Sequence, residues 1–205
     1  GWGKASWGKI YGQWLCGCGV MVYDFDIFSP EKLLKVIEDF KVTSFCAPPT
    51  VYRYFIKKDM KKFDLSHLEH ITTAGEALNP EVFEQVHKQT GLQIMEGFGQ
   101  TESVLMLGNL VGSTAKIGSL GKPTPLYNIM IADNEGNRLP ANEVGEIVVI
   151  PSENQHGIFM GYCGNEDLYA NVWKYGIYHT GDTAYMDDDG YYWYVGRIDD
   201  LIKTR

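Results

Sequence analysis

The strongest constraint on the fold is a change of pattern part-way along the chain. Residues 1 to about 110 alternate between short apolar runs and amphipathic stretches, which is typical of a mostly parallel sheet covered by helices. After about residue 112, Gly118, Gly121, Pro123 and Pro125 interrupt the chain and helical periodicity disappears. The sequence therefore predicts an α/β fold, with a mostly parallel sheet flanked by helices and followed by a smaller antiparallel β subdomain.

Local signals place the expected elements. Helices should begin at Ser29-Pro30-Glu31 and at Asn79-Pro80-Glu81, where a capping side chain precedes a proline and a carboxylate. The turn-rich segment 133–137 and the turn 187–190, which opens into an aromatic run over 191–195, predict antiparallel connections. Strands are expected over 20–23, 43–47, 71–74, 92–95, 128–132 and 146–150, and a further helix over 52–58.

Composition excludes several classes of protein. The 205 residues are 44% hydrophobic, enough for a packed core, and the net charge of -8 without a Lys/Arg-rich run argues against a nucleic-acid surface or an anionic membrane as partner. No apolar run reaches the ~18 residues that a membrane span needs. The four cysteines lack paired metal-site spacing and are interpreted as reduced core thiols, which predicts a cytoplasmic protein.

The hexapeptide over 97–102, Gly-Phe-Gly-Gln-Thr-Glu, has the chemistry of a nucleotide site. The Thr101 hydroxyl can bond a phosphate oxygen, the Glu102 carboxylate can hold Mg²⁺, and the glycines let the backbone lie close to a flat base. The loop over 73–77 follows the preceding strand, so we expect the two loops to lie side by side at the carboxyl edge of the sheet. Phe98 is then available to stack on the base.

Simpler interpretations exist for each part. The 75–77 segment alone fits an ordinary turn between a strand and a helix, and Phe98 alone fits a core position. Acidic residues over 187–189 suggest a hairpin turn rather than a Ca²⁺ loop. No persuasive serine or cysteine nucleophile is present, which favours chemistry by positioning and electrostatics.

Several motifs occur in the order found in one superfamily, and they cover almost the whole chain. The sequence resembles the adenylate-forming, or AMP-binding, superfamily of acyl-CoA synthetases, luciferases and nonribosomal peptide adenylation domains. The motifs that carry the resemblance are Gly-Glu-Ala-Leu-Asn-Pro at 75–80, the hexapeptide at 97–102, Gly-Ser-Leu-Gly-Lys-Pro at 118–123, Tyr-His-Thr-Gly-Asp at 178–182, and Gly-Arg-Ile-Asp-Asp-Leu-Ile-Lys at 196–203.

The resemblance implies a role for each matching residue. Thr101 would bond the α-phosphate and Glu102 would hold Mg²⁺. Asp182 would accept hydrogen bonds from both ribose hydroxyls, Arg197 would reach the ribose or phosphate side, and Asp199 would be the pivot of a domain rotation. The adenine slot would be formed by Gly75, Glu76 and Ala77 on one face, completed by Gly97, Phe98 and Gly99, with Gln100 also among the nucleotide-binding residues.

The resemblance also implies a reaction and an acyl pocket. A carboxylate joins ATP to give acyl-AMP and pyrophosphate, and coenzyme A then displaces AMP. The opening residues look most like acetyl- and medium-chain acyl-CoA synthetases, and strict acetyl enzymes carry a tryptophan where this chain has Gly99. Ala74 and Gly3 are also small, so the pocket should admit a short-to-medium chain. Lys4 near the pocket either faces solvent or favours a polar acid.

Parts of the family pattern lie outside the sequence. The phosphate loop that should precede residue 1 and the C-terminal lid are absent, so the chain is interpreted as a fragment that is inactive alone and can self-associate through exposed surface. Its expected divisions are 1–112 (α/β), 113–195 (antiparallel β) and 196–205 (hinge). Two alternatives stay open: a nucleotide-binding module without ligase activity, and an adenylation domain that serves a carrier protein.

Overall fold

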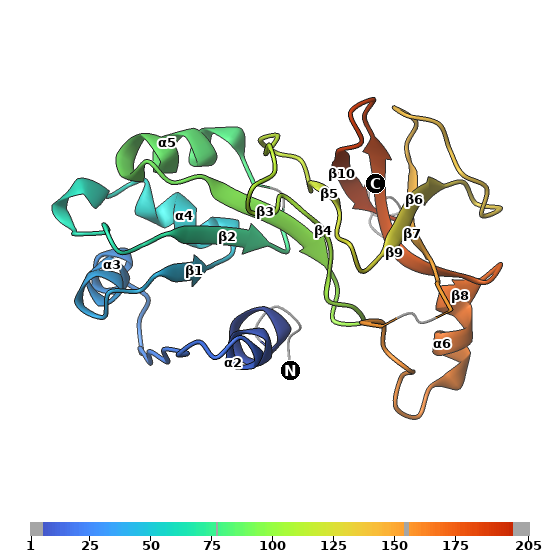
Figure 1. Ribbon diagram of the computed structural model, residues 1–205, viewed down its shortest axis with the longest axis horizontal. Coiled ribbons are helices and arrows are strands. Elements are labelled where there is room, and N and C mark those ends of the chain that lie inside the picture. The colour runs from blue at the N-terminus through green and yellow to red at the C-terminus, as the bar shows by residue number, and fades with distance from the viewer. Residues whose placement is uncertain (1–5, 77, 154–155, 199–205) are drawn as a thin grey trace. The chain divides into compact units, whose positions relative to one another are not determined.

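The chain forms two compact units. The computed structural model describes residues 6–76, 78–153 and 156–198 (Figure 1). The units are Gly1–Gly97 and Phe98–Arg205. The sequence analysis expects three divisions with the first boundary near residue 112, and these divisions stay a prediction.

The first unit is built on three strands that pair in parallel. Strand β1 pairs with β2, and β2 pairs with β3 with Ala74 opposite Gly97. The last two residues of β3, Phe98 and Gly99, begin the second unit. The elements in chain order are η1 (Ser6–Tyr11), α2 (Gly12–Leu15), α3 (Pro30–Asp39), β1 (Ser44–Cys46), α4 (Pro49–Phe55), η2 (Met60–Lys62), β2 (His70–Ala74), α5 (Pro80–Thr90) and β3 (Ile94–Gly99).

Helices α3 and α5 begin where the sequence predicts. The Ser29 side chain caps α3 by accepting a hydrogen bond from the Lys32 backbone N–H at 3.3 Å. The Asn79 side chain caps α5 by accepting from the Glu81 N–H at 2.8 Å. Each helix thus satisfies one of the backbone donors that its first turn leaves without a partner.

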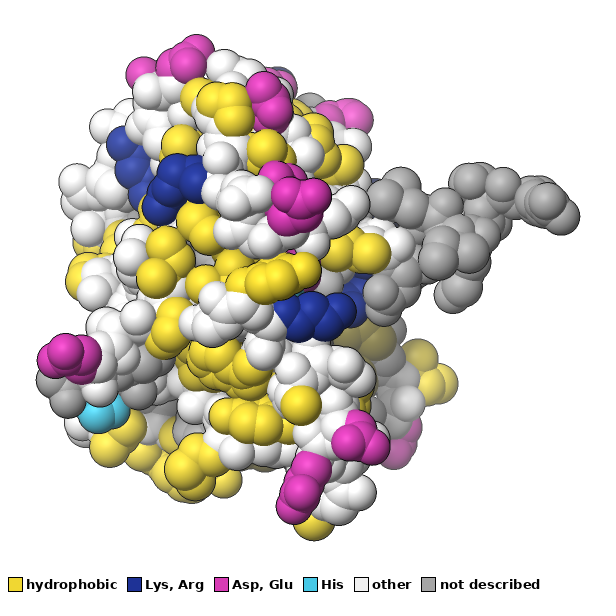
Figure 2. All heavy atoms as spheres, turned by 90° about the vertical axis from the view of Figure 1, so that its right-hand side faces the viewer, with side chains coloured by type: hydrophobic (Ala, Val, Ile, Leu, Met, Phe, Trp, Pro, Cys, Tyr) yellow, Lys and Arg dark blue, Asp and Glu magenta, His cyan; other side chains and the backbone are white. Residues whose placement is uncertain are grey.

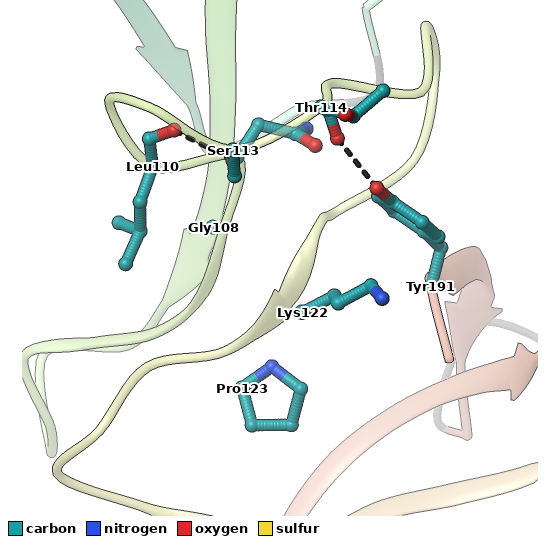
Figure 3. A pocket seen from close by; sticks show the side chains of 8 residues that line it. Gly108, Leu110, Ser113, Thr114, Lys122, Pro123 and Tyr191 are labelled. Carbon is teal, nitrogen blue, oxygen red and sulfur yellow. Dashed lines mark hydrogen bonds between the residues drawn. The ribbon is translucent and has the colours of Figure 1, made fainter. Parts of the chain in front are cut away.

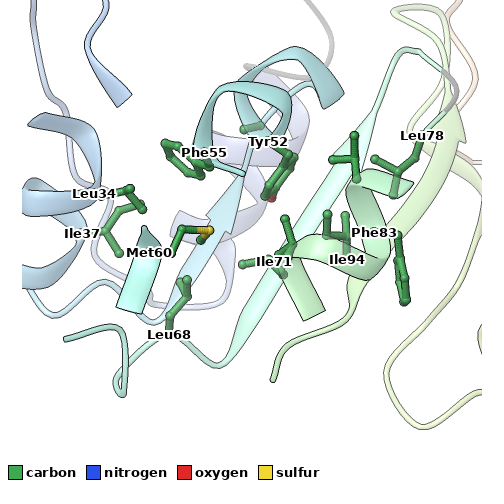
Figure 4. Close-up of a cluster of buried hydrophobic side chains, with 13 residues drawn as sticks. Leu34, Ile37, Tyr52, Phe55, Met60, Leu68, Ile71, Leu78, Phe83 and Ile94 are labelled. Carbon is green, nitrogen blue, oxygen red and sulfur yellow. The ribbon is translucent and has the colours of Figure 1, made fainter. Parts of the chain in front are cut away.

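Apolar side chains from the helices meet the sheet in one core (Figure 4). Leu34 and Ile37 come from α3, Tyr52 and Phe55 from α4, and Ile71 from β2, and all are buried. The Tyr52 hydroxyl donates to the backbone oxygen of Thr72 at 3.0 Å, so its polar end is also satisfied. This core fixes β2 and β3, whose carboxyl ends carry the predicted loops.

The second unit is built on an antiparallel sheet. The strands of this sheet follow the order β10-β9-β7-β6, and β8 pairs with β9. Strands β4 and β5 pair with each other outside this sheet. Its core includes Met106, Leu107, Ile147, Val149 and Tyr178. The elements in chain order are β4 (Leu105–Gly108), β5 (Lys122–Pro123), β6 (Asn128–Ala132), β7 (Gly145–Ile150), α6 (Glu166–Val172), β8 (Trp173–Lys174), β9 (Ile177–Met186) and β10 (Tyr192–Arg197).

The predicted fold class is confirmed, but two strand predictions need correction. Residues 20–23 form no strand: Val22 is 88% exposed, so the apolar run has neither a buried face nor a pairing partner in the described chain. The strand expected over 92–95 instead covers Ile94–Gly99. Pairing with β2 extends to Gly97 and the strand itself continues to Gly99, so the first half of the hexapeptide is strand and not loop.

The exposure of three cysteines corrects the expectation that all four are core thiols. Cys16, Cys18 and Cys163 are exposed, so they are not core thiols, although all four cysteines, with Cys46, are free. Cys16 and Cys163 lie in turns, and none of the three belongs to the hydrophobic clusters of the described residues. On the face drawn in Figure 2, basic side chains are few. No helix in the described residues is long and apolar enough to cross a membrane.

Candidate functional site

The Thr-Gly-Asp motif forms a bulge in β9. Glu146 of β7 lies opposite Thr183, and Val148 lies opposite His179, so residues 180–182 of β9 face the single residue Ile147. Gly181 takes a left-handed backbone conformation with φ of 73°, which glycine adopts without steric cost. A bulge of this kind re-aims a side chain out of the regular ladder. Here the side chain that follows the glycine is Asp182.

Side chains of the same strands satisfy the backbone of the bulge. The Thr180 hydroxyl donates to the Ile147 backbone oxygen at 2.7 Å and accepts from the Asp182 N–H at 3.1 Å. The Gly181 N–H donates to Glu146 Oε1 at 2.8 Å. The other oxygen of Glu146 lies 2.7 Å from His179 Nδ1. The sequence thus encodes the bulge through Thr180, Gly181 and Glu146 together.

Asp182 is a buried carboxylate surrounded by hydrogen-bond donors. The residue is 5% exposed. Gln100 Nε2 donates to Oδ2 at 2.6 Å, the Tyr194 hydroxyl donates to Oδ1 at 3.3 Å, and Arg197 Nη1 lies 3.5 Å from both oxygens. A carboxylate offers about four acceptor positions. Four contacts from the protein already reach the carboxylate, and those from Tyr194 and Arg197 are the longest, so a ligand with paired hydroxyls would replace or share them.

Gln100 joins the hexapeptide to the bulge. Its Nε2 donates to the Thr180 backbone oxygen at 2.8 Å as well as to Asp182, and its Oε1 accepts from the Tyr178 hydroxyl at 2.8 Å. Gln100 was expected to bind nucleotide, but its amide is engaged by the protein on both ends. The geometry gives it the task of holding Asp182 in place, and its nucleotide contact stays a prediction.

Two tyrosines beside the hexapeptide are held in their neutral, donating form. Burial first, and then the negative charges of Glu102 and its neighbours, raise the pKa of Tyr178 far above its ordinary value. Burial and the hydrogen bond to Glu102 raise the pKa of Tyr162 to about 12. Both hydroxyls therefore act as fixed hydrogen-bond donors at neutral pH.

In the described part of the chain, the Glu102 side chain is held by a hydrogen bond and the Thr101 side chain is not. The Tyr162 hydroxyl donates to Glu102 Oε1 at 3.0 Å, which fixes the carboxylate. Thr101 is exposed, and its hydroxyl has no hydrogen-bond partner in the described part of the chain. No group of three or more His, Cys, Asp and Glu side chains in that part could hold a metal ion. Glu102 thus offers one carboxylate, which fits Mg²⁺ because that ion is often held by one or two carboxylates and substrate phosphates.

The other predicted loop follows β2 in the first unit. Gly75 has φ of 93°, a conformation that favours glycine. The Glu76 carboxylate accepts from Arg53 Nη2 at 2.8 Å. The backbone N–H of Leu78 donates to Glu96 Oε1 at 3.1 Å, so β3 anchors the chain just after the loop. Ala77 lies outside the described residues.

Glu96 is a buried carboxyl directly before the hexapeptide. The residue is 4% exposed, and burial raises its pKa to about 7, with the Leu78 N–H acting in the opposite direction. The prediction that the two loops are neighbours is consistent with Ala74 pairing with Gly97. Glu96 had not been singled out, because no motif distinguishes a buried glutamate from an exposed one.

Gly99 and Phe98 have structural roles of their own. A Cβ on Gly99 would lie 2.4 Å from the backbone oxygen of Val104, so the crossing chain leaves no room for a side chain. Phe98 is half-buried and packs against the core of the second unit. The acyl-pocket role of Gly99 and the base-stacking role of Phe98 therefore stay predictions. Gly3 and Lys4 of the pocket and Asp199 of the hinge lie outside the described residues.

A hollow of about 270 Å³ lies elsewhere in the second unit. It is lined by Asn109, Ser113, Thr114, Lys122 and Tyr191, among others, and none of the residues predicted to bind nucleotide lines it. Figure 3 shows the Lys122 side chain extending toward the Tyr191 ring, whose centroid lies 4.6 Å from Lys122 Nζ.

Comparisons with known proteins agree with the motifs. The model of a family described as AMP-binding enzyme matches residues 4–163. The chain is 41% identical over 206 residues to the mitochondrial acyl-coenzyme A synthetase ACSM3 of Mus musculus, covering 100% of this chain and 35% of the relative. It is 41% identical over 203 residues to the mitochondrial acyl-coenzyme A synthetase ACSM4 of Homo sapiens, covering 98% and 35%. The chain thus spans about a third of the length of these relatives.

Solved structures are similar over nearly the whole chain. An anthranilate CoA ligase, AuaEII, in complex with anthranoyl-AMP is 30% identical with a TM-score of 0.88, covering 97% of this chain and 38% of that one. An acyl-CoA synthetase of Brucella canis is 28% identical with a TM-score of 0.86, covering 98% and 37%. These neighbours are adenylate-forming enzymes, and they support the predicted order of subdomains.

The comparisons correct the expected location. The cytoplasmic prediction rested on cysteines read as reduced thiols, and cysteine usage does not distinguish between reducing compartments. The curated relatives named above are mitochondrial proteins. The prediction of a cytoplasmic protein is therefore wrong.

Proposed function

The chain belongs to the family of AMP-binding enzymes, and from this membership we propose that it supplies the nucleotide-binding part of an ATP-dependent acyl-CoA synthetase. The observation that carries the proposal is the buried Asp182 carboxylate, presented by a bulge and fixed by Gln100 at 2.6 Å. Paired ribose hydroxyls are the ligand groups that such an acceptor suits. Beside Gln100 in the chain stand Thr101, which has an unengaged hydroxyl, and Glu102, which has a fixed carboxylate.

The proposed chemistry proceeds by positioning. Asp182 would hold the ribose and Thr101 would donate to an α-phosphate oxygen, so that a carboxylate oxygen of the acid attacks the α-phosphorus and pyrophosphate leaves. Glu102 would hold Mg²⁺, which when bound neutralises charge on the phosphates. The thiol of coenzyme A would then attack the acyl carbonyl carbon and AMP would leave. Arg197, 42% exposed, would be able to reach the ribose or phosphate side.

The proposed acid is one of short-to-medium chain length. Ala74 and Gly99 are small at positions that line the acyl pocket in the family, and each further CH₂ buried there would add ~0.8 kcal/mol of binding. Similarity to an anthranilate CoA ligase keeps aromatic acids within the range to be tested. The names of the relatives favour a mitochondrial location.

Pyrophosphate release tests the proposal in the full-length protein that contains this chain. The assay would use ATP and a series of carboxylic acids from acetate upward, with and without coenzyme A. We expect release that depends on the acid and is greatest with acids longer than acetate. Asp182→Asn should lower kcat/KM for ATP by about tenfold or more, because it removes the negative charge and one of the two acceptor oxygens.

Each contrary result has a defined meaning. Binding of AMP without acid-dependent pyrophosphate release would make the chain part of a nucleotide-binding module. Dependence on a carrier protein instead of coenzyme A would indicate an adenylation domain. A preference for acetate would contradict the pocket argument. We expect the 205 residues alone to be inactive, and gel filtration of that piece would test whether it self-associates.

A further inference from the structure

We propose that Glu146 is a positioning residue for ribose binding, because its carboxylate fixes the backbone bulge that presents Asp182. This inference rests on the proposed function of Asp182. Glu146 lies on β7, and none of the sequence motifs that point to the nucleotide site contains it. The geometry nevertheless assigns both of its oxygens to the Thr-Gly-Asp segment of β9.

The two oxygens of Glu146 divide between two residues of β9. Oε1 accepts from the Gly181 N–H at 2.8 Å, and Oε2 lies 2.7 Å from His179 Nδ1. The side chains of Glu146 and His179 are 14% and 11% exposed. A carboxylate with two oxygens can bridge both groups at once, whereas a single hydroxyl could satisfy only one of them.

The bulge explains why the bridge is needed. Because residues 180–182 face only Ile147, the ladder between β7 and β9 provides no regular carbonyl partner for the Gly181 N–H. Gly181 is half-buried, and an N–H left there without a partner is destabilising. A glycine at φ of 73° has other conformations available once its N–H is released. Asp182 follows directly in the chain, so the backbone dihedrals of Gly181 set where its carboxylate lies.

The His179 ring orients the Glu146 carboxylate. His179 Nε2 is buried and has no hydrogen-bond partner among the described residues. Its Nδ1 lies 2.7 Å from Glu146 Oε2, so that carboxylate is the hydrogen-bond partner that the described residues give the ring. The Tyr175 ring packs edge-on against it, 6.4 Å between centroids. His179 therefore holds one carboxylate oxygen while the other holds Gly181.

The rest of the bulge does not depend on Glu146. The Thr180 hydroxyl still bonds the Ile147 backbone oxygen, and Gln100 still bonds the Thr180 oxygen and Asp182. Removal of the Glu146 carboxylate should therefore leave the sheet intact and release Gly181. The effect should appear in ribose recognition and not in the binding of the acid.

The experiment compares ribose discrimination in variants of the full-length protein. It would measure KM and kcat for ATP, 2′-deoxy-ATP and 3′-deoxy-ATP, and KM for the acid, by pyrophosphate release. The variants are Glu146→Ala, which removes both acceptors, and Glu146→Gln, whose amide oxygen can still accept from Gly181. The matched control is Glu143→Ala, an exposed glutamate just before β7.

Glu146→Ala should raise KM for ATP about tenfold, the loss of one charged hydrogen bond, with less than about a twofold change in KM for the acid. Its preference for ATP over the two deoxy nucleotides should fall toward one. Glu146→Gln should restore most of the preference, and Glu143→Ala should behave as the wild type. A role in stability alone would not produce this selective loss of ribose discrimination.

Contrary outcomes separate this inference from the proposed function. A wild-type protein that binds no adenine nucleotide would refute the proposed function itself. A wild type that discriminates, together with a Glu146→Ala variant that discriminates equally well, would refute only the inference. If Glu146→Ala does not fold, Glu146→Asp decides by the same measurements, because its shorter side chain cannot reach both partners. Unchanged discrimination in that variant would overturn the proposal.

Discussion

At the scale of a single residue, two explanations exist for the glycine at position 99. From the sequence, its missing side chain suggests room for an acyl chain. In the structure, the Val104 backbone oxygen would lie 2.4 Å from a Cβ at this position, which is closer than real contacts allow. The steric explanation needs no ligand, so it can be tested by stability alone.

Gly99→Ala should lower the free energy of unfolding by about 1 to 3 kcal/mol, because the methyl group forces the backbone at Val104 and Leu105 to move. Thermal and urea unfolding of the full-length protein would measure the change. Gly19→Ala is the control, because a Cβ there has no atom within 4 Å. Equal stability of Gly99→Ala and the wild type would show that the segment moves without cost.

Glu96 predicts a pH dependence of stability. Its pKa is about 7 in the folded protein against an ordinary 4.5, so the folded state holds the proton more tightly than the unfolded state. Between these two values the folded state binds more protons, and the free energy of unfolding must fall as pH rises. The loss should reach up to about 3 kcal/mol by pH 7 and then level off.

Glu96→Gln should remove this dependence, because the amide is neutral at every pH and its oxygen can still accept from Leu78. Unfolding midpoints between pH 4.5 and 8 should therefore fall less steeply in the variant, which becomes the more stable protein near pH 8. Glu84→Gln, at an exposed position of α5, serves as the control. Parallel curves for Glu96→Gln and the wild type would contradict the prediction.

At the scale of elements, the sequence predicted best where local chemistry decides. The caps at Ser29 and Asn79 were correct because each side chain bonds a backbone N–H within three residues. The strand expected over 128–132 coincides with β6 because turns bound it on both sides. The run over 20–23 failed because its pattern lacked the tertiary partner that a strand requires.

The site was predictable in its residues but not in its connections. Motifs identified Gln100, Glu102 and Asp182, yet nothing local indicates that Gln100 bonds Asp182, which lies 82 residues away. The bulge was also missed, since it depends on the register between β7 and β9 and not on either strand alone. Glu146 and Tyr162 escaped notice for the same reason.

The side-chain cap of helix α5, which follows the loop over 73–77, allows a prediction about stability. Asn79→Ala should destabilise the protein by about 1 kcal/mol, because the Glu81 N–H loses its acceptor. Asn79→Asp should retain the acceptor and place a negative charge at the positive end of the helix dipole, so it should match or exceed the wild type. Thermal unfolding would measure both. A loss with aspartate equal to that with alanine would rule out the capping explanation.

At the scale of the whole molecule, carboxyl groups whose pKa differs between the folded and unfolded states make stability depend on pH. The two units contain carboxyls with opposite shifts. Burial raises the pKa of Glu96 in the first unit. In the second unit, burial also acts to raise the pKa of Asp187, but Lys116, the Tyr191 N–H and Trp193 together outweigh it and lower the pKa. The stability curve of the protein should therefore have two limbs with different origins.

In the curve of unfolding free energy against pH, Asp187→Asn should flatten the acid limb. Glu96→Gln should flatten the limb toward neutral pH. Asp187 lies 2.7 Å from Lys116 Nζ and 3.0 Å from Trp193 Nε1. Its lowered pKa contributes stability above the ordinary value of 3.8, and that contribution is lost as pH falls below it. Asp187→Asn should thus be less stable than the wild type at pH 7, with the gap narrowing in acid. In the double variant the two effects should add, because the named partners of the two carboxyls are different residues. Unfolding midpoints from pH 2.5 to 8 would measure these effects. If the difference in stability between Asp187→Asn and the wild type does not narrow in acid, the Lys116–Asp187 pair is not the origin of the acid limb.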